Sequence, residues 1–167
     1  DIVDANLNDG DTASVVTFSF SEVPTNFTAA DLTAVGGTVS GLTQDLVGDP
    51  SGKTYTATFT ADDNYAGTGS VTVGSGWQDA AGNAGVGSAD TVTIDTVNPT
   101  VTVDIVDGSL NDGDNTSVVA VTFSEVTRNF TAGELTGVGG AVTGLTQDLV
   151  GDPSGKTYRS EERREGN

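Results

Sequence analysis

The chain has 167 residues, with 24 Asp or Glu against 6 Lys or Arg and a formal net charge of −18. This charge argues against binding to nucleic acid or to an anionic membrane surface, since both depend on Lys and Arg. The absence of His and Cys excludes a Ser-His-Asp triad, a thiolate nucleophile and the usual zinc ligand sets. No apolar run is long enough to span a membrane. We therefore expect a protein that is not an enzyme and does not insert into membranes.

The acidic residues are mostly of one type, 18 Asp against 6 Glu. Asp favours turns, because its short carboxylate bonds to nearby main-chain groups, whereas Glu favours helices. The composition therefore predicts few helices and many carboxylates in loops. Carboxylate and carbonyl oxygens are the ligands that Ca²⁺ prefers, and so Ca²⁺ is the cofactor that this composition favours.

A long internal repeat dominates the organisation of the chain. Residues 1–55 align without gaps with residues 104–158, and 41 of the 55 positions are identical. A period of 103 residues is the length of one small domain. We predict a near-complete first repeat over residues 1–97 and a second, truncated after about four strands, over residues 98–158. With no initiator Met, the chain is interpreted as a monomeric internal fragment.

The last nine residues differ in kind from the repeats. Where the first repeat continues as TATFTADDNYAG, the second reads RSEERREGN, and this tail holds half of the basic residues in the chain. The tail resembles the translation of a sequencing-library adapter, and we expect residues 159–167 to be non-native or disordered. Without its remaining strands, the second repeat is not expected to fold cooperatively alone.

Apolar and polar residues alternate with the two-residue period of a half-buried strand. Thr and Val dominate these segments, and both are β-branched residues that suit strands. In the first repeat, strands are predicted at about 1–4, 15–21, 33–39, 42–47, 54–60, 70–77 and 89–95. Seven strands in about 100 residues predict an all-β fold, an immunoglobulin-like antiparallel sandwich in tandem repeat. The segment 27–32 could form one helical turn.

The large apolar side chains of these segments are assigned to the core of the sandwich rather than to a ligand-binding platform. The predicted core consists of Phe18, Phe20, Phe27, Leu32, Leu42, Leu46, Tyr55, Phe59, Trp77 and Ile94.

Successive loops of such a sandwich should fall at opposite ends. Glu22, Asp49, Asp79 and Asn83 are expected at the end opposite to the linker. The other end should collect five carboxylates, those of Asp9, Asp11, Asp62, Asp63 and Asp95. Like charges at short range oppose ionisation, and a cation bound among them would remove that repulsion. A metal site is therefore predicted where the first repeat meets the second.

Three segments, FSFSEVPTNFTAADL, WQDAAGNAG and VTIDTVNPTVTV, resemble the bacterial Ig-like repeats of giant secreted surface adhesins, many of them exported by type I secretion. The resemblance covers residues 1–158. It implies an extracellular or cell-surface location and a role as an extender that carries a distal adhesion domain. Neighbouring repeats of the same chain would be the partners. It also implies that Ca²⁺ stiffens the junctions, held here by Asp79, Asn83, Asp95 and Asn98.

Several alternatives stay open on the sequence alone. The acidic loops could serve solubility without binding a cation. The chain could be a carbohydrate- or protein-binding module, or an accessory domain of a secreted enzyme. An EF-hand reading of DANLNDGD fails, because the sixth position is Asp9 rather than Gly and the twelfth is Val15 rather than Glu.

Overall fold

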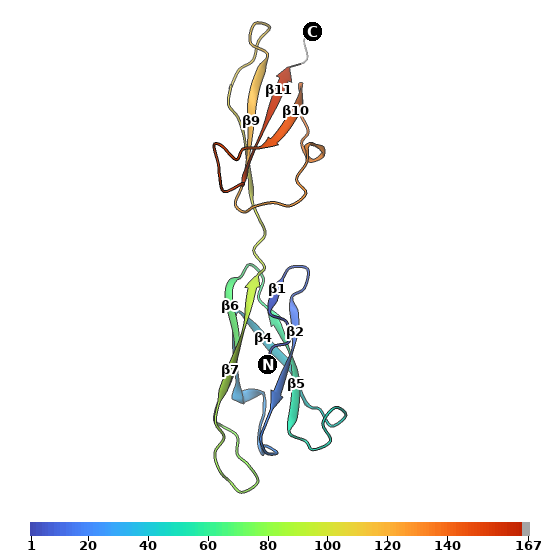
Figure 1. Ribbon diagram of the computed structural model, residues 1–167, viewed down its shortest axis with the longest axis vertical. Coiled ribbons are helices and arrows are strands. Elements are labelled where there is room, and N and C mark those ends of the chain that lie inside the picture. Colours follow the sequence, from blue (N-terminus) through green and yellow to red (C-terminus); the bar gives the residue numbers. More distant parts are fainter. Residues whose placement is uncertain (165–167) are drawn as a thin grey trace. The chain divides into compact units, whose positions relative to one another are not determined.

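The computed structural model describes residues 1–164, and the last three residues of the predicted tail lie outside that range. The chain forms two compact units, Asp1–Asn98 (unit 1) and Pro99–Asn167 (unit 2), which are drawn in Figure 1. Each unit is described by itself. Within the described range, no helix is both long and apolar enough to cross a membrane.

Unit 1 is a sandwich of two sheets. Its strands are β1 (Asn6–Asn8), β2 (Ala13–Ser19), β3 (Leu32–Val35), β4 (Gly37–Gln44), β5 (Thr54–Ala61), β6 (Ala66–Val73) and β7 (Ser88–Asp95). One sheet has the order β1-β7-β6-β3 and the other the order β2-β5-β4. These seven strands confirm the predicted all-β, immunoglobulin-like fold. The expected helical turn is the short 3₁₀ helix Ala29–Asp31.

Three predicted strands have the wrong boundaries. One is the segment 70–77, because β6 begins at Ala66 and ends at Val73. The segment 33–39 is divided at Gly36, so that β3 pairs with β6 in one sheet and β4 pairs with β5 in the other. Gly36 has a φ of 71°, a conformation that residues with a Cβ rarely adopt, and this turns the chain between the sheets. The segment 42–47 is not a separate strand, because β4 continues past an irregularity between Ser40 and Thr43 and ends at Gln44.

The start of the chain also differs from the prediction of a strand over residues 1–4. Ile2 makes only an isolated bridge to Val16 of β2. The chain then crosses to the other sheet, where β1 pairs with β7 in parallel, the one exception to the antiparallel pairing expected. Leu7, which lies between the predicted strands 1–4 and 15–21, is 2% exposed, and its burial anchors this crossing.

The core of unit 1 lies between the two sheets. Its buried members are Ile2, Leu7, Val16, Phe18, Phe27, Ala57, Phe59, Val71, Val92 and Ile94. The remaining predicted core residues are only partly buried against this cluster, except Leu46, which was predicted wrongly. Leu46 is 57% exposed, because it lies in the turn between β4 and β5, beyond the cover of the second sheet. Phe20 and Phe27 pack edge to face against each other, and the rings of Phe18, Tyr55 and Trp77 pack edge to face against one or both of them.

Unit 2 is a single sheet. Its strands are β8 (Val101–Ile105), β9 (Thr116–Phe123), β10 (Gly140–Gln147) and β11 (Thr157–Arg164), in the order β10-β11-β9-β8. A 3₁₀ helix, Ala132–Glu134, repeats the one in unit 1. In the described part of unit 2 no second sheet covers this one. Its buried apolar side chains there are Val119 and Val121.

Residues 159–164 of the tail form most of β11, so these residues are ordered, while the non-native origin of the tail stays a prediction. They pair with β9 and with β10, in the alignment register of β5. Strand pairing uses main-chain groups, which is why a changed sequence can still extend the ladder. The side chains do not match, however, because Glu162 takes the position of Phe59, which is 0% exposed in unit 1.

A urea titration tests whether the two units differ in stability. Trp77, the single Trp of the chain, reports on unit 1 alone, whereas far-ultraviolet circular dichroism reports on both units. We expect the dichroism to begin changing at lower urea than the Trp77 emission, because unit 2 buries little apolar surface. Coincident transitions with an m-value appropriate to the whole chain would contradict this expectation.

Truncation of the most buried side chain tests the core of unit 1. Phe59→Ala is expected to lower the free energy of unfolding of unit 1 by about 3–5 kcal/mol, through lost burial and the cavity left behind. The matched control is Val47→Ala, because Val47 is 96% exposed and its truncation should change stability by less than about 0.5 kcal/mol. Trp77 fluorescence in urea measures both variants.

Candidate functional site

Three acidic segments meet at the end of unit 1 where β7 finishes, as the sequence predicted (Figure 1). Asn8 of β1 lies opposite Asp95 of β7. Asn8 also exchanges two main-chain hydrogen bonds with Asp11, of 3.0 and 2.9 Å. The tight turn that carries Asp9 and Asp11 is therefore placed beside the end of β7 by strand pairing alone.

The third segment, Asp62–Asp63, is held by a buried threonine. The hydroxyl of Thr96, which is 1% exposed, donates to the carbonyl oxygen of Asp62 at 2.7 Å and accepts from the main-chain N–H of Tyr65 at 3.0 Å. Sequence reasoning missed this residue. The alternation of Val92 and Ile94 extends to Thr96, and that period could have identified it as inward-facing.

The segments that carry these carboxylates meet at one end of unit 1, but the carboxylates do not form a ready cage. The side chains of Asp9, Asp11, Asp62 and Asp95 are exposed, and no hydrogen bond to them is found among residues 1–164. Asp63 accepts from the main chain and side chain of Asn64. Across the described residues, no three acidic side chains are grouped so that they could hold a metal ion. The oxygen donors suit Ca²⁺ in type, while their spacing is not that of a preformed site.

The loop that carries Asp79 and Asn83 closes on itself at the opposite end of unit 1. The main-chain N–H and the side-chain amide of Asn83 donate to the Asp79 carboxylate at 2.8 and 2.7 Å. These two hydrogen bonds hold the pKa of the Asp79 carboxyl below its ordinary value, and the bond from the side-chain amide of Asn83 has the larger effect. Within unit 1 the length of β7 separates Asp79 and Asn83 from Asp95. Asn98, which follows β7 in the chain, is exposed.

The remaining loops also gather at that opposite end, as predicted. The main chains of Thr25 and Gln78 pair across the end of the sandwich. The ammonium of Lys53, in the turn between β4 and β5, donates to the carbonyl oxygen of Ser21 at 2.9 Å. In the same turn the side chains of Ser51 and then Thr54 donate to Asp49 and lower the pKa of its carboxyl. Ser51 is thus part of a hydrogen-bonded turn.

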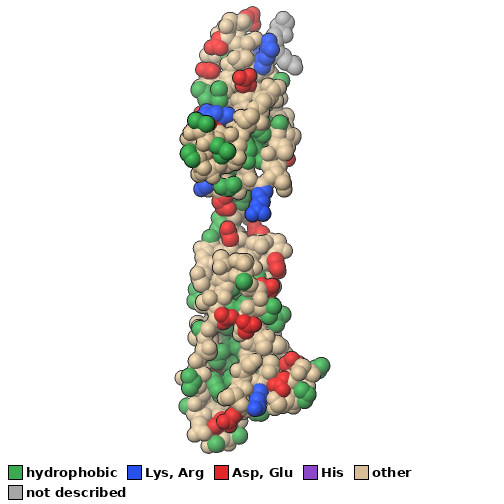
Figure 2. All heavy atoms as spheres, in the orientation of Figure 1, with side chains coloured by type: hydrophobic (Ala, Val, Ile, Leu, Met, Phe, Trp, Pro, Cys, Tyr) green, Lys and Arg blue, Asp and Glu red, His purple; other side chains and the backbone are tan. Residues whose placement is uncertain are grey.

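The profile of the bacterial Ig-like domain matches residues 1–94 and again residues 95–158, nearly the whole chain. The chain belongs to the bacterial Ig-like domain family. Members of this family are typically non-catalytic modules, and they are common in extracellular surface proteins. No curated protein matches the chain. On the face drawn in Figure 2, acidic side chains are spread along the surface and basic ones are few.

Substitution of Thr96 tests its role in holding the acidic loop. Thr96→Val keeps the shape of the side chain but removes the hydroxyl, leaving the Tyr65 N–H and the Asp62 carbonyl without their partner. We expect unit 1 to lose about 1–3 kcal/mol of stability. Thr96→Ser keeps the hydroxyl and should avoid most of that loss, as measured by urea denaturation followed at Trp77. Equal losses in the two variants would show that the hydroxyl is not what matters.

The pH dependence of stability tests the closed loop at Asp79. A carboxyl whose pKa is lowered by folding stabilises the protein above its unfolded pKa, near 3.8, and loses that contribution as the pH falls through its folded pKa. Asp79→Ala is therefore expected to lower the Tm of unit 1 at pH 7 and to have little effect below about pH 3. Asp9→Ala, which removes an exposed carboxylate, is the control. A loss of Tm that is the same at both pH values would contradict the assignment.

Proposed function

We propose that the chain is a structural extender repeat of a bacterial cell-surface adhesin, stiffened by Ca²⁺ where one repeat leads into the next. The observation that carries this proposal is the tandem repetition of one Ig-like unit, together with the meeting of three acidic loops at the end of unit 1. A spacer needs a fold that tolerates repetition and a defined exit for the chain, and unit 1 has both.

Ca²⁺ would be bound at the exit end of unit 1. Asp9, Asp11, Asp62 and Asp95 would supply carboxylate oxygens, and their exposed side chains are free to change rotamer. Asp63 already bonds to Asn64 and would contribute less. An ion that binds only the folded form stabilises it by RT ln(1 + [Ca²⁺]/Kd), which is about 1 kcal/mol at a few-fold excess. Extracellular modules have Kd values of order 10⁻⁴–10⁻³ M.

The pair Asp79 and Asn83 is a second, weaker candidate for a Ca²⁺ ligand. Its carboxylate is already satisfied by the loop it closes, so an ion there would compete with two hydrogen bonds. We therefore place the stiffening ion at the exit end, with Asn98 as a further oxygen donor on the linker.

A thermal melt of the chain in EDTA, in millimolar Ca²⁺ and in millimolar Mg²⁺ tests the proposal. We expect Ca²⁺ to raise the Tm reported by Trp77 by a few degrees, with a smaller effect of Mg²⁺, which requires stricter octahedral geometry. The rise should be lost in the double variant Asp62→Asn, Asp95→Asn, which keeps the shape of both side chains.

The matched control is the double variant Glu22→Gln, Asp49→Asn, which removes the same charge from the opposite end of unit 1 at two residues that are not proposed as Ca²⁺ ligands. It should keep the Ca²⁺ response. Equal Tm values in the three solutions would remove Ca²⁺ from the function of this domain and leave the acidic loops as solubility features. An equal loss in both variants would show that net charge, not a site, produces the response.

A further inference from the structure

The turn between β4 and β5 contains an Asp–Pro peptide bond, Asp49–Pro50, and projects from the side of unit 1 (Figure 1). Asp49 is half-buried and Pro50 is exposed. An Asp–Pro bond is broken by acid more easily than other peptide bonds, because the aspartate carboxyl lies beside its own main-chain carbonyl and the proline nitrogen leaves as a basic secondary amine. Unit 2 has the same bond, Asp152–Pro153, at the corresponding turn.

Cleavage of this bond requires only water and groups that the turn itself contains. One oxygen of the neutral Asp49 carboxyl forms a bond to the main-chain carbonyl carbon of Asp49, and the carboxyl proton passes to the nitrogen of Pro50. The C–N bond then breaks, which leaves a cyclic anhydride on Asp49 and a free amine on Pro50. Water opens the anhydride to two carboxyl groups, so that no further reactant is consumed.

The turn already supports the carbonyl group that would be attacked. The main-chain N–H of Gly52 donates to the carbonyl oxygen of Asp49 at 3.1 Å. A donor at this oxygen stabilises the negative charge that develops on it during the attack. Gly155 donates to the carbonyl oxygen of Asp152 at the same distance in unit 2. Each turn therefore combines a neighbouring carboxyl, a donor to the carbonyl oxygen and a proline leaving group at one bond.

The carboxylate of Asp49, in contrast, is fully engaged with the residues that follow it. One oxygen accepts from the main-chain N–H and the hydroxyl of Ser51 at 3.0 and 2.6 Å. The other accepts from the main-chain N–H of Lys53 at 3.2 Å and from the hydroxyl of Thr54 at 2.9 Å. These bonds favour the ionised carboxylate, and its oxygens must leave their donors to reach the carbonyl carbon. The folded turn therefore opposes both the protonation and the attack.

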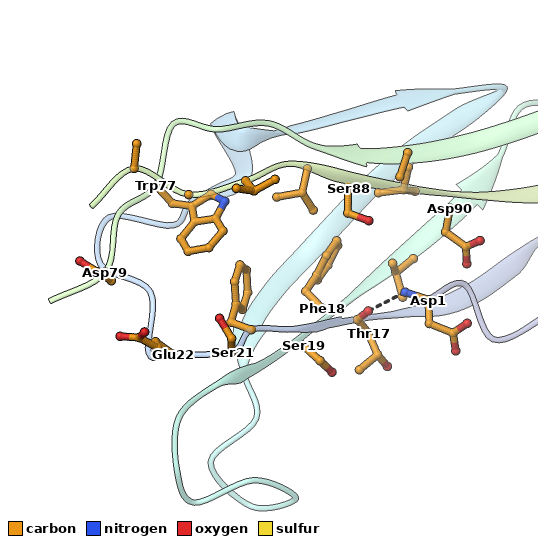
Figure 3. Close-up of a pocket in the computed structure, with 18 of the residues that line it drawn as sticks. Asp1, Thr17, Phe18, Ser19, Ser21, Glu22, Trp77, Asp79, Ser88 and Asp90 are labelled. Carbon is orange, nitrogen blue, oxygen red and sulfur yellow. Dashed lines mark hydrogen bonds between the residues drawn. The ribbon is translucent and has the colours of Figure 1, made fainter. Parts of the chain in front are cut away.

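The turn is also fixed to the rest of unit 1. The ammonium of Lys53 donates to the carbonyl oxygen of Ser21 at 2.9 Å, and Figure 3 shows Ser21 on the segment that follows β2. The charged groups around Asp49 are Asp45 and Lys53 of the turn and Glu22, the residue after Ser21. The pKa of the Asp49 carboxyl is lowered by hydrogen bonds rather than by any of these charges.

We propose that Asp49–Pro50 is a self-cleavage site that the folded turn protects, and that acid breaks this bond once the hydrogen bonds to the Asp49 carboxylate are lost. Cleavage would leave β4 beside β5, because the two strands pair over Gly37–Gln44. It would replace a covalent connection within unit 1 by a noncovalent one. The proposal depends neither on Ca²⁺ nor on the adhesin role.

Mass spectrometry of the full chain, incubated in acid and then denatured, tests the proposal. The fragments that end at residue 49 and at residue 152 report on the two bonds separately. Incubation is carried out at the lowest pH at which Trp77 emission still reports a folded unit 1, with and without urea. We expect Asp49–Pro50 to be cleaved at least roughly tenfold faster in urea. In urea the two bonds should be cleaved at equal rates, because residues 41–55 and 144–158 are identical.

Variants of the turn identify the source of the protection. The double variant Ser51→Ala, Thr54→Val removes both hydroxyl donors to Asp49. Without urea it should be cleaved at residue 49 roughly tenfold faster than the unmodified chain, each rate being divided by its own rate in urea. The matched control Thr58→Val removes a hydroxyl from an exposed position of the same strand and should change nothing. Asp49→Asn should abolish cleavage at residue 49 and leave that at residue 152.

Four results would overturn the proposal. An equal rate at Asp49–Pro50 with and without urea would show that the folded turn gives no protection. An unchanged rate in the double variant, with unit 1 still folded, would show that the hydroxyl donors do not restrain the carboxylate. Cleavage at residue 49 that persists in Asp49→Asn would exclude attack by this side chain. The absence of cleavage at both bonds in urea would show that neither is a self-cleavage site.

Discussion

The structure of unit 1 depends on the covering of β5 by a second sheet. Phe59, at the middle of β5, is 0% exposed, and the strands that bury it come from both ends of the repeat. Unit 2 provides the internal comparison, because it has the same sheet without that cover. There the position of Phe59 is taken by Glu162, and Val101, Val103 and Ile105 are 51%, 58% and 46% exposed. Hydrogen-bonded ladders form in both units, but an extensive core forms only where a second sheet lies opposite.

The alternation of Val, Thr and aromatic residues in unit 1 predicts the all-β fold, the strands β2, β5, β6 and β7 approximately, and four of the ten buried core residues, Phe18, Phe27, Phe59 and Ile94. What the alternation does not contain is the assignment of strands to sheets. Gly36 divides a segment whose pattern is that of one strand. The division depends on the positive φ of Gly36, which the alternation of apolar and polar residues does not predict. The alternation also does not predict β1, which contains the buried Leu7, because this strand is only three residues long. The strand of residues 159–164 was missed because main-chain pairing tolerates side chains that propensity disfavours.

The candidate site was likewise predictable only in part. Topology alone places the segments of Asp9, Asp62 and Asp95 at one end, since alternate loops of a sandwich share an end. It does not place exposed carboxylates relative to each other, because their rotamers are set by local hydrogen bonds and solvent. Asp79 illustrates this, since its carboxylate is taken up by Asn83, four residues away. Thr96 shows the reverse case, in which an uncharged residue organises the acidic end through a buried hydroxyl.

The parallel pairing of β1 with β7 has a mechanical consequence for a repeated surface module. In unit 1 the chain enters ahead of β1 and leaves after β7, and the two strands run in the same direction. Tension applied to the two ends would pull β1 and β7 in opposite senses along their length. The hydrogen bonds between them would then be loaded together, in shear, instead of being opened one after another as when a hairpin is peeled from its end. The same three-residue strand that closes one side of the sandwich therefore acts as a clamp against extension.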